Sequence, residues 1–184
     1  NAAHQSAEDD YVEALIAEIE SSADAPRLKG GLIHAVFIGG GTPTSLSAEN
    51  AARVLSTLCR VLPLANDYEL TLEGRIHDLV PEKIEAWLAN GVNRISLGVQ
   101  SFDTKVRQSQ GRIETREEVL ERLKLLKSYE QCSVVLDLIF GLPGQSMEVW
   151  QQDLDDLIAS GIDGADFYQL NVFEGSDLNK RIAE

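Results

Sequence analysis

Four stretches of this sequence combine glycine or polar side chains with a preceding apolar run. They occupy residues 39–44, 73–75, 100–102 and 141–145. An apolar run that ends at glycine or at a polar group is typical of a buried strand that meets a loop. Loops held at the ends of buried strands often carry binding residues. Each stretch is therefore a candidate for ligand chemistry.

The sequence GGGTP at residues 39–43 permits more than one interpretation. A strand, a glycine-rich loop and a helix N-terminus are the parts of a phosphate site, where backbone N–H groups bind the anion. GGGTP contains no lysine and matches neither G-x-G-x-x-G nor G-x-x-x-x-G-K-[ST], and Pro43 removes one donor. A loop with fewer donors and free carbonyls can accept hydrogen bonds from an ammonium group. A purely structural turn also remains open.

Four polar side chains could contact a small molecule. Glu73 and Gln100 each follow the apolar half of an expected strand, and an amide offers both a donor and an acceptor. Asp137 is embedded in VVLDLIFG, and a buried carboxylate needs partners. Asp137 is thus either a structural hydrogen-bond hub or a ligand group. Arg112 could form a bidentate contact with a carboxylate, although solvated loop positions would also be ordinary for Arg112 and Glu73.

The hydrophobic pattern predicts the elements that position these residues. Residues 7–23 have helical spacing, with Asp9 and Asp10 as expected caps of the helix start, and Ser47 is the expected N-cap of a second helix. The expected strands are residues 34–38, 68–74, 93–100, 133–141 and 164–173; the expected helices that follow the first four are residues 47–62, 81–90, 116–129 and 147–160. Residues 101–115 are expected to form a loop.

This order predicts an α/β protein with a parallel sheet, in a single domain over residues 1–184. The strands are apolar throughout rather than alternating, which suits a sheet covered by helices. In parallel α/β folds the ligand site lies at the carboxyl ends of the strands. Five strands that follow a helix suggest an incomplete (β/α) barrel without its opening strand, and a doubly wound sheet is the alternative. Asn1 and Ala2 are set aside as a tag remnant.

Composition excludes several classes of function. The hydrophobic content of 43% and the charged content of 25% are those of an ordinary globular protein. A formal net charge of -14 makes nucleic acid and anionic membrane surfaces poor partners. No long apolar run and no signal peptide are visible, so no transmembrane helix is expected. The two cysteines, far apart in the sequence, fit a reducing cytoplasm, so we expect a cytoplasmic protein. The two cysteines, Cys59 and Cys132, cannot build a four-ligand metal site, so no metal ligand is assigned.

Several motifs together resemble a known family. FIGGGTPTSLS, ISLGVQSFD, QGR and LDLIFGLPGQS, in this order and spacing, resemble radical S-adenosylmethionine (SAM) enzymes of the oxygen-independent coproporphyrinogen III oxidase group. That group includes haem chaperones and anaerobic haem-degrading methyltransferases of haem utilisation. The resemblance covers residues 11–184. LEGRIHD stands where the oxidases and chaperones have IEANP or IEVDP, and it looks more like the haem-utilisation branch.

The resemblance implies a partial (β/α)6 barrel with SAM lying across the carboxyl ends of the strands. It implies that the glycine loop meets the SAM amino group, that an arginine pairs with the SAM carboxylate, and that polar strand ends hold the ribose beside an apolar adenine contact. The residues implied for the SAM amino group are Gly40, Gly41 and Thr42, and Arg112 is implied for the SAM carboxylate. The residues implied for the ribose are Glu73, Gln100 and Asp137, and Ile139 is implied for the adenine.

The resemblance also implies a [4Fe–4S] cluster, whose CxxxCxxC motif is absent from these residues. In the family this motif follows the first strand, so we expect it upstream of Tyr11, in a protein of which this sequence is an inactive part. The implied partners are a tetrapyrrole substrate and an electron donor. The implied reaction is methylation and ring opening of haem; decarboxylation of coproporphyrinogen propionates and a haem-chaperone role are the alternatives. No catalytic residue is assigned.

An opening strand that lies outside the sequence would leave one edge of the sheet unpaired. The strand at residues 34–38 would then expose a row of backbone N–H and C=O groups. We therefore expect either edge-to-edge dimerisation or coverage of this edge by the N-terminal helix.

Overall fold

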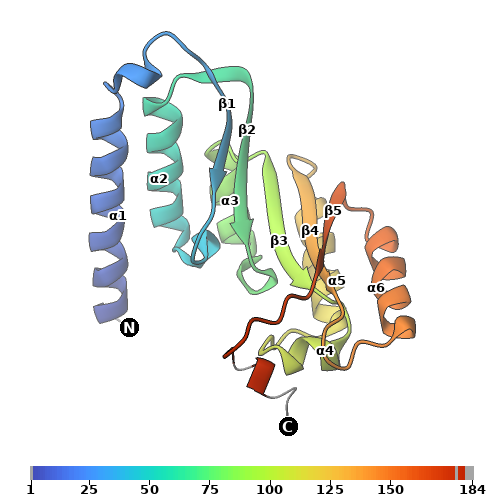
Figure 1. The fold of residues 1–184 in the computed structure, drawn as a ribbon. Helices are drawn as coiled ribbons and strands as arrows, with labels where there is room; N and C mark the ends of the chain where they lie inside the picture. Colours follow the sequence, from blue (N-terminus) through green and yellow to red (C-terminus); the bar gives the residue numbers. More distant parts are fainter. Residues whose placement is uncertain (1, 177, 181–184) are drawn as a thin grey trace.

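One parallel sheet organises the protein, for which a computed structural model describes residues 2–176 and 178–180 (Figure 1). The strands are β1 (Ile33–Ile38), β2 (Leu64–Gly74), β3 (Arg94–Gln100), β4 (Ser133–Phe140) and β5 (Gly164–Gln169). Each strand lies beside the one before it, in the order β1-β2-β3-β4-β5, and every neighbouring pair is parallel. A doubly wound sheet would reverse this order at a switch point. The expected partial barrel is therefore confirmed, as a curled half-barrel.

Helices cover one face of the sheet (Figure 1). Those on this face are α2 (Ala48–Val61), α3 (Pro81–Ala89), α5 (Arg116–Lys127) and α6 (Met147–Ala159). Helix α1 (Ala2–Ser22) packs against α2, and α4 (Thr104–Ser109) lies at the carboxyl ends of the strands (Figure 1). Side chains of α2, α3 and α5 form one core cluster with alternate residues of β2, β3 and β4, among them Leu55, Trp87 and Leu123. Because this cluster is continuous across three βα units, it fixes the curvature of the sheet and the height of the strand ends.

Two expectations about helices are wrong. Helix α1 begins at Ala2, so Asp9 and Asp10 lie inside it and do not cap its start. Asp9 instead accepts a hydrogen bond from the side-chain amide of Asn50 at 2.7 Å, which joins α1 to α2. Within the expected loop at residues 101–115, the chain forms α4, because Asp103 caps it by accepting from the N–H of Val106. The N-cap role of Ser47 is confirmed.

Two strand boundaries also differ from expectation. Strand β2 begins at Leu64, four residues before the expected start, and β5 ends at Gln169 rather than at residue 173. Strand β5 pairs only with β4 among the described residues, and β4 ends at Phe140, opposite Gln169. The N–H of Leu170 still donates to the carbonyl of Phe140, but β4 offers no partner beyond that point, so the later apolar residues lie outside the sheet.

The two faces of the sheet differ in polarity. Leu70 and Leu72 of β2 face the helices and are at most 3% exposed. The residues between them face the other, concave side, because side chains alternate along a strand. The register pairs place on this side Glu69, Thr71 and Glu73 of β2; Arg94, Ser96 and Gly98 of β3; Val135, Asp137 and Ile139 of β4; and Gly164, Asp166 and Tyr168 of β5. Closed barrels of this type fill their interior with bulky branched side chains, whereas this concave face is mainly polar.

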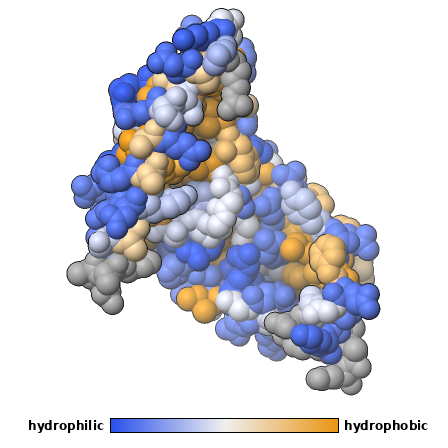
Figure 2. Space-filling view, turned by 60° about the vertical axis from the view of Figure 1, so that its left-hand side comes forward, coloured by the Kyte–Doolittle hydropathy of each residue, from blue (hydrophilic) through white to orange (hydrophobic). Residues whose placement is uncertain are grey.

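Strand β1 forms one edge of the sheet. Among the described residues it pairs only with β2, and α1 packs against α2 rather than against β1. An apolar groove of about 900 Å³ lies between α1, α2 and β1. Figure 2 shows apolar residues gathered in a hollow on this side of the molecule. Coverage of the β1 edge by the N-terminal helix is therefore wrong, while dimerisation through that edge stays a prediction.

Within the described residues, no helix is both long enough and apolar enough to span a membrane.

Candidate functional site

The glycine loop after β1 excludes side chains for two separate reasons. Gly40 and Gly41 have φ values of +79° and +48°, in the left-handed region that favours glycine. A Cβ atom on Gly39 would lie 2.5 Å from the ring of Phe37 and 2.6 Å from Oε2 of Glu73. The positive φ values of Gly40 and Gly41 allow the loop to turn. The missing side chain at Gly39 allows the backbone to approach the end of β2.

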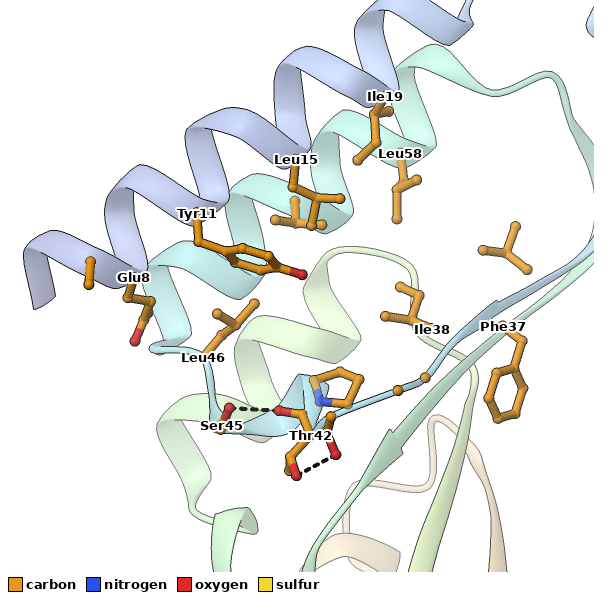
Figure 3. Close-up of a pocket in the computed structure, with 17 residues that line it drawn as sticks. Glu8, Tyr11, Leu15, Ile19, Phe37, Ile38, Thr42, Ser45, Leu46 and Leu58 are labelled. Carbon is orange, nitrogen blue, oxygen red and sulfur yellow. Dashed lines mark hydrogen bonds between the residues drawn. The ribbon is translucent and has the colours of Figure 1, made fainter. Parts of the chain in front are cut away.

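Hydrogen bonds close the loop on itself as it enters the short 3-10 helix Pro43–Ser45. The hydroxyl of Thr42 donates to the carbonyl of Gly41 at 2.7 Å, and the hydroxyl of Ser45 donates to the carbonyl of Thr42 at 2.6 Å (Figure 3). Thr44 is fully buried and donates to Oδ2 of Asp78 at 2.7 Å. The loop is thereby anchored to the segment that follows β2.

Glu73 lies where β2 ends, on the concave face. Its Oε2 accepts a hydrogen bond from the N–H of Gly40 at 3.4 Å, so the glycine loop and the β2 end form one unit. The side chain is half-buried rather than a solvated loop glutamate. Its other carboxylate oxygen has no hydrogen-bond partner among the described residues, which leaves an acceptor for a ligand.

Gln100, the last residue of β3, carries two signs of a binding position. Its φ of 71° lies in the left-handed region, which a non-glycine residue occupies only at a cost of about 1–3 kcal/mol. Its Oε1 atom is buried and has no hydrogen-bond partner among the described residues. A buried acceptor without a donor costs about 1–3 kcal/mol. Gln100 turns back over Gly98, where an added Cβ would meet its Nε2 at 2.9 Å. The strain and the missing donor occur together at the carboxyl end of a central strand.

Asp137 lies on the concave face of β4 and makes no hydrogen bond with the described residues. Burial raises the pKa of its carboxyl, and the neighbouring Asp166 and Glu73 raise that pKa further, while Arg94 lowers it. Of the two alternatives, the hydrogen-bond hub is therefore wrong. The hub on this side of the protein is Asp153 of α6, which is 1% exposed.

Asp153 ties together the loops that follow β3 and β4. Its carboxylate accepts from the hydroxyl of Ser101 at 2.8 Å, from the N–H of Phe102 at 2.6 Å, and from the side-chain amide of Gln145 at 3.0 Å. Gln145 in turn donates to the carbonyl of Ile139 at 3.2 Å. This network holds the loop after β3 and the end of β4 at a fixed separation.

Arg112 is half-buried and directed at the concave face, not into solvent as an ordinary loop arginine would be. Its Nη1 donates to the carbonyl of Gly98 at 2.7 Å. Burial lowers the pKa of the Arg112 guanidinium, and the charge of Arg75 lowers it further, whereas Glu114 raises it. Among the described residues, no carboxylate lies within ion-pair distance of Arg112. It remains free to pair with the carboxylate of a ligand.

Sequence reasoning missed the support beneath this arginine. Arg107 of α4 is 1% exposed and donates to the carbonyls of Val99 at 2.7 Å and Glu114 at 2.9 Å. Its Nη2 also bonds Oε2 of Glu114 at 3.1 Å. Arg107 therefore fixes the loop that carries Arg112. No sequence signal could have identified it, because a lone arginine in a six-residue helix is normally solvated.

Two further concave residues were also missed. Asp166 and Tyr168 of β5 stand in register with Asp137 and Ile139 of β4. The charges of Asp137 and Asp166 raise the pKa of the Tyr168 hydroxyl, which keeps it protonated. The alternation of GADFYQ could have placed both residues on one face, but its sequence does not say which face is concave. The eight expected site residues thus lie along one concave face and its rim, and Asp166 and Tyr168 extend that face.

The apolar groove meets this site at the glycine loop. Tyr11, Leu15 and Ile19 of α1 line one wall, Leu58 of α2 lines the floor, and Ile38 precedes the glycines (Figure 3). The glycine loop therefore has the polar concave face on one side and an apolar groove on the other.

Comparison with known proteins decides the family. A model of the radical SAM superfamily matches residues 2–157. The chain belongs to the radical SAM superfamily. The expected membership of the radical SAM enzymes is thereby confirmed.

Curated relatives of this radical SAM chain are considerably longer. An anaerobilin synthase from Escherichia coli O157:H7 is 43% identical over 172 residues, which cover 94% of this chain and 39% of the relative. The haem chaperone HemW of Escherichia coli K12 is 35% identical over 164 residues, which cover 89% of this chain and 43% of the relative. The chain thus spans less than half the length of these relatives.

A solved structure agrees with the fold. The coproporphyrinogen III oxidase HemN of Escherichia coli, a radical SAM enzyme, superposes with a TM-score of 0.83 at 26% identity. The match covers 96% of this chain and 40% of HemN. The likeness extends over the whole half-barrel, including the strand ends that carry the candidate site.

The cysteines present do not fit an iron–sulfur cluster. Cys59 of α2 and Cys132 before β4 are both half-buried, and burial raises the pKa of each thiol. Cys132 lies at the amino ends of the strands, opposite the glycine loop. The described residues contain no group of three or more His, Cys, Asp or Glu side chains placed to hold a metal. A cluster would need ligands from other residues.

Proposed function

We propose that this chain is the SAM-binding part of a radical SAM enzyme that acts on haem or a related tetrapyrrole. The family supports the cofactor, and the relatives named for anaerobilin, haem and coproporphyrinogen support the class of substrate. The observation that carries the proposal is Gln100, whose buried Oε1 lacks a donor while its backbone is strained. A hydroxyl of a bound ribose would supply that donor and offset the strain.

The other concave residues suit the remaining groups of SAM. The carbonyls of Gly40 and Gly41 would accept hydrogen bonds from the ammonium group, because Pro43 removes a donor from this loop. The carbonyl of Thr42 already accepts from the N–H and the hydroxyl of Ser45, so Thr42 would accept through its hydroxyl oxygen instead. Arg112 would pair with the SAM carboxylate through its free N–H groups.

The ribose and adenine would lie over the middle of the sheet. Glu73 and Asp137 would accept from the ribose hydroxyls beside Gln100, since neither carboxylate is fully satisfied by the protein. Ile139 would contact the adenine with its apolar side chain. Asp166 adds a third carboxylate to this face, and the surplus of negative charge suits a ligand that carries a sulfonium and an ammonium group.

Within this arrangement the chain binds and orients SAM and shields it. The [4Fe–4S] cluster, held by cysteines other than Cys59 and Cys132, would supply the electron that cleaves SAM. Tyr168 stays protonated beside Asp137 and can donate a hydrogen bond to a ligand over the face. The half-barrel excludes water from one side only, so closure of the site requires further protein or substrate.

The anaerobilin synthase relative favours the haem-degrading reaction over the alternatives. Its identity of 43% exceeds the 35% of HemW and the 26% of HemN. Decarboxylation of coproporphyrinogen and haem delivery by a chaperone remain the alternative functions on this scaffold.

Calorimetric titration of SAM tests the site in full-length protein. Gln100→Ala should weaken SAM binding about tenfold, because one hydrogen bond within a buried site is lost. Gln151→Ala, on the exposed face of α6, is the matched control and should bind SAM as the unaltered protein does. Equal affinity in the Gln100 variant would overturn the proposed site.

Product analysis separates the enzyme from its alternatives. Cluster-loaded full-length protein, incubated with SAM, haem and a reductant, should release 5′-deoxyadenosine and consume haem. Loss of carbon dioxide from coproporphyrinogen would instead indicate the oxidase. Stable haem binding and transfer without 5′-deoxyadenosine would indicate the chaperone and contradict the proposal.

A further inference from the structure

A second cavity lies at the carboxyl-end rim, next to the candidate SAM site. It has a volume of about 350 Å³ and separates the segment after β2 from the loop between α4 and α5. Its polar lining consists of Arg75, His77, Arg112 and Glu114, set between Ile76 and Ile113. Arg112 also touches the concave face at Gly98, so the cavity and the SAM site share one wall.

Positive charge exceeds negative charge around this cavity. Arg75 and Arg112 line it together with the carboxylate of Glu114. Asp78 and Glu114 are the carboxylates within ion-pair distance of the lining and its support. Asp78 already pairs with Arg75 at 3.1 Å, and Glu114 already pairs with Arg107 at 3.1 Å. In a chain of net charge -14, such a surplus is a local reversal of sign. A concentrated positive potential in a recess attracts anions.

The cationic groups differ in whether they can reach a ligand. Arg107 is 1% exposed and bonded to Glu114, Val99 and Ser101, so a ligand cannot reach it. Arg75 is 48% exposed, and its bonds to Asp78 through Nε and Nη2 leave Nη1 unbonded. His77 is 60% exposed, and its Nδ1 faces Glu114 at 3.2 Å, which turns Nε2 away from that carboxylate. Contacts with Asp78 and Glu114 therefore hold Arg75 and His77 in place, while both side chains remain accessible from the solvent.

We infer that this cavity is a second carboxylate site, which binds a propionate side chain of the tetrapyrrole through the unbonded Nη1 of Arg75. The inference rests on the proposed function, because haem and its relatives carry propionate carboxylates. Arg112 would bind the carboxylate of SAM on its concave side, so the two anions would lie on either side of one guanidinium. Ile113 is 71% exposed at the cavity edge and offers an apolar contact to the macrocycle.

Haem and its dimethyl ester test the inference in full-length protein, with the Soret band as the readout. The ester keeps the ring and the iron and removes both carboxylate charges. Haem should bind at least about tenfold more tightly than the ester, and Arg75→Ala should abolish most of this difference. Arg75→Lys, which keeps the charge without the planar fork, should retain part of it. Arg60→Ala, on α2 far from the cavity, is the control for loss of an exposed arginine.

The outcomes separate this inference from the proposed function. If Arg75→Ala, Arg75→Lys and the unaltered protein all bind haem equally, the carboxylate site is wrong and tetrapyrrole binding stands. Equal binding of haem and its ester by the unaltered protein would also show that the carboxylate site is wrong, while tetrapyrrole binding stands. If neither compound binds, both the tetrapyrrole function and the carboxylate site are overturned. Thermal melts of the Arg75 variants control for unfolding, since Arg75→Ala leaves Asp78 with one cation fewer.

Discussion

Asp137 on β4 and Asp166 on β5 occupy the same register position and share the concave face of the sheet. Neighbouring side chains at one register position lie close together. Burial raises the pKa of the Asp137 carboxyl, and the charge of Asp166 raises it further. The protein keeps this unfavourable pair on the face where we place a cationic ligand.

The raised pKa of Asp137 predicts how stability depends on pH. A carboxyl whose pKa is higher in the folded state favours folding while it is protonated, and this advantage is lost as pH rises through the folded-state pKa. Asp137→Asn should therefore raise the melting temperature at about pH 7 by roughly 2 °C and have little effect near pH 3. Thermal unfolding of both proteins across this range measures the difference. Asp10→Asn, on the exposed side of α1, should change nothing, and a pH-independent gain in Asp137→Asn would contradict the prediction.

Replacement of Gln100 by glycine should stabilise the ligand-free protein and weaken its binding of SAM. Gln100→Gly removes the strain at φ 71° and the unpaired Oε1, so the ligand-free protein should gain about 1 kcal/mol in unfolding free energy while SAM binding weakens. Glu130→Gly is the matched control, because Glu130 is the other described non-glycine residue with positive φ and lies away from the site. Urea unfolding should show a larger gain for Gln100→Gly than for Glu130→Gly. A smaller gain would mean that the unpaired oxygen costs nothing.

Addition of one methyl group at Gly74 should destabilise the protein. A Cβ atom there would lie 2.4 Å from Cγ2 of Thr44, which is fully buried and bonded to Asp78, so it cannot move aside. Gly74→Ala should lower the unfolding free energy by about 1–3 kcal/mol. Gly31→Ala, where nothing lies within 4 Å of the added atom, is the control for the same substitution. Equal stability of the two variants in urea would show that the Thr44 anchor yields.

The open edge of β1 predicts self-association of the 184-residue chain. Sedimentation velocity should show a dimer whose population rises with concentration, because unpaired strand edges pair with one another. Phe37 is 62% exposed on β1, and Phe37→Lys should shift the equilibrium to monomer. Phe173→Lys replaces a 75% exposed phenylalanine away from this edge and should leave the dimer intact. A chain that stays monomeric at the highest concentration would contradict the prediction.

The order of helices and strands, and the placement of Glu73, Gln100 and Asp137 at strand ends, followed from the residue pattern alone. Hydrophobic periodicity and glycine positions are local properties, and in a parallel sheet they are enough to predict that polar strand ends share one rim. The same local signals misplaced the start of α1 and missed α4. In both places a capping residue was misjudged because its partner could not be seen.

Tertiary structure alone decided which buried aspartate is satisfied and which is not. Asp153 reads as an ordinary residue of an amphipathic helix, yet it binds two loops, whereas Asp137 in its apolar strand has no hydrogen bond. The pairing of Asp137 with Asp166 and the support of Arg112 by Arg107 likewise depend on register and packing between segments far apart in the chain. Burial and partners are properties of the assembled sheet, because they arise from contacts that no single stretch of sequence contains.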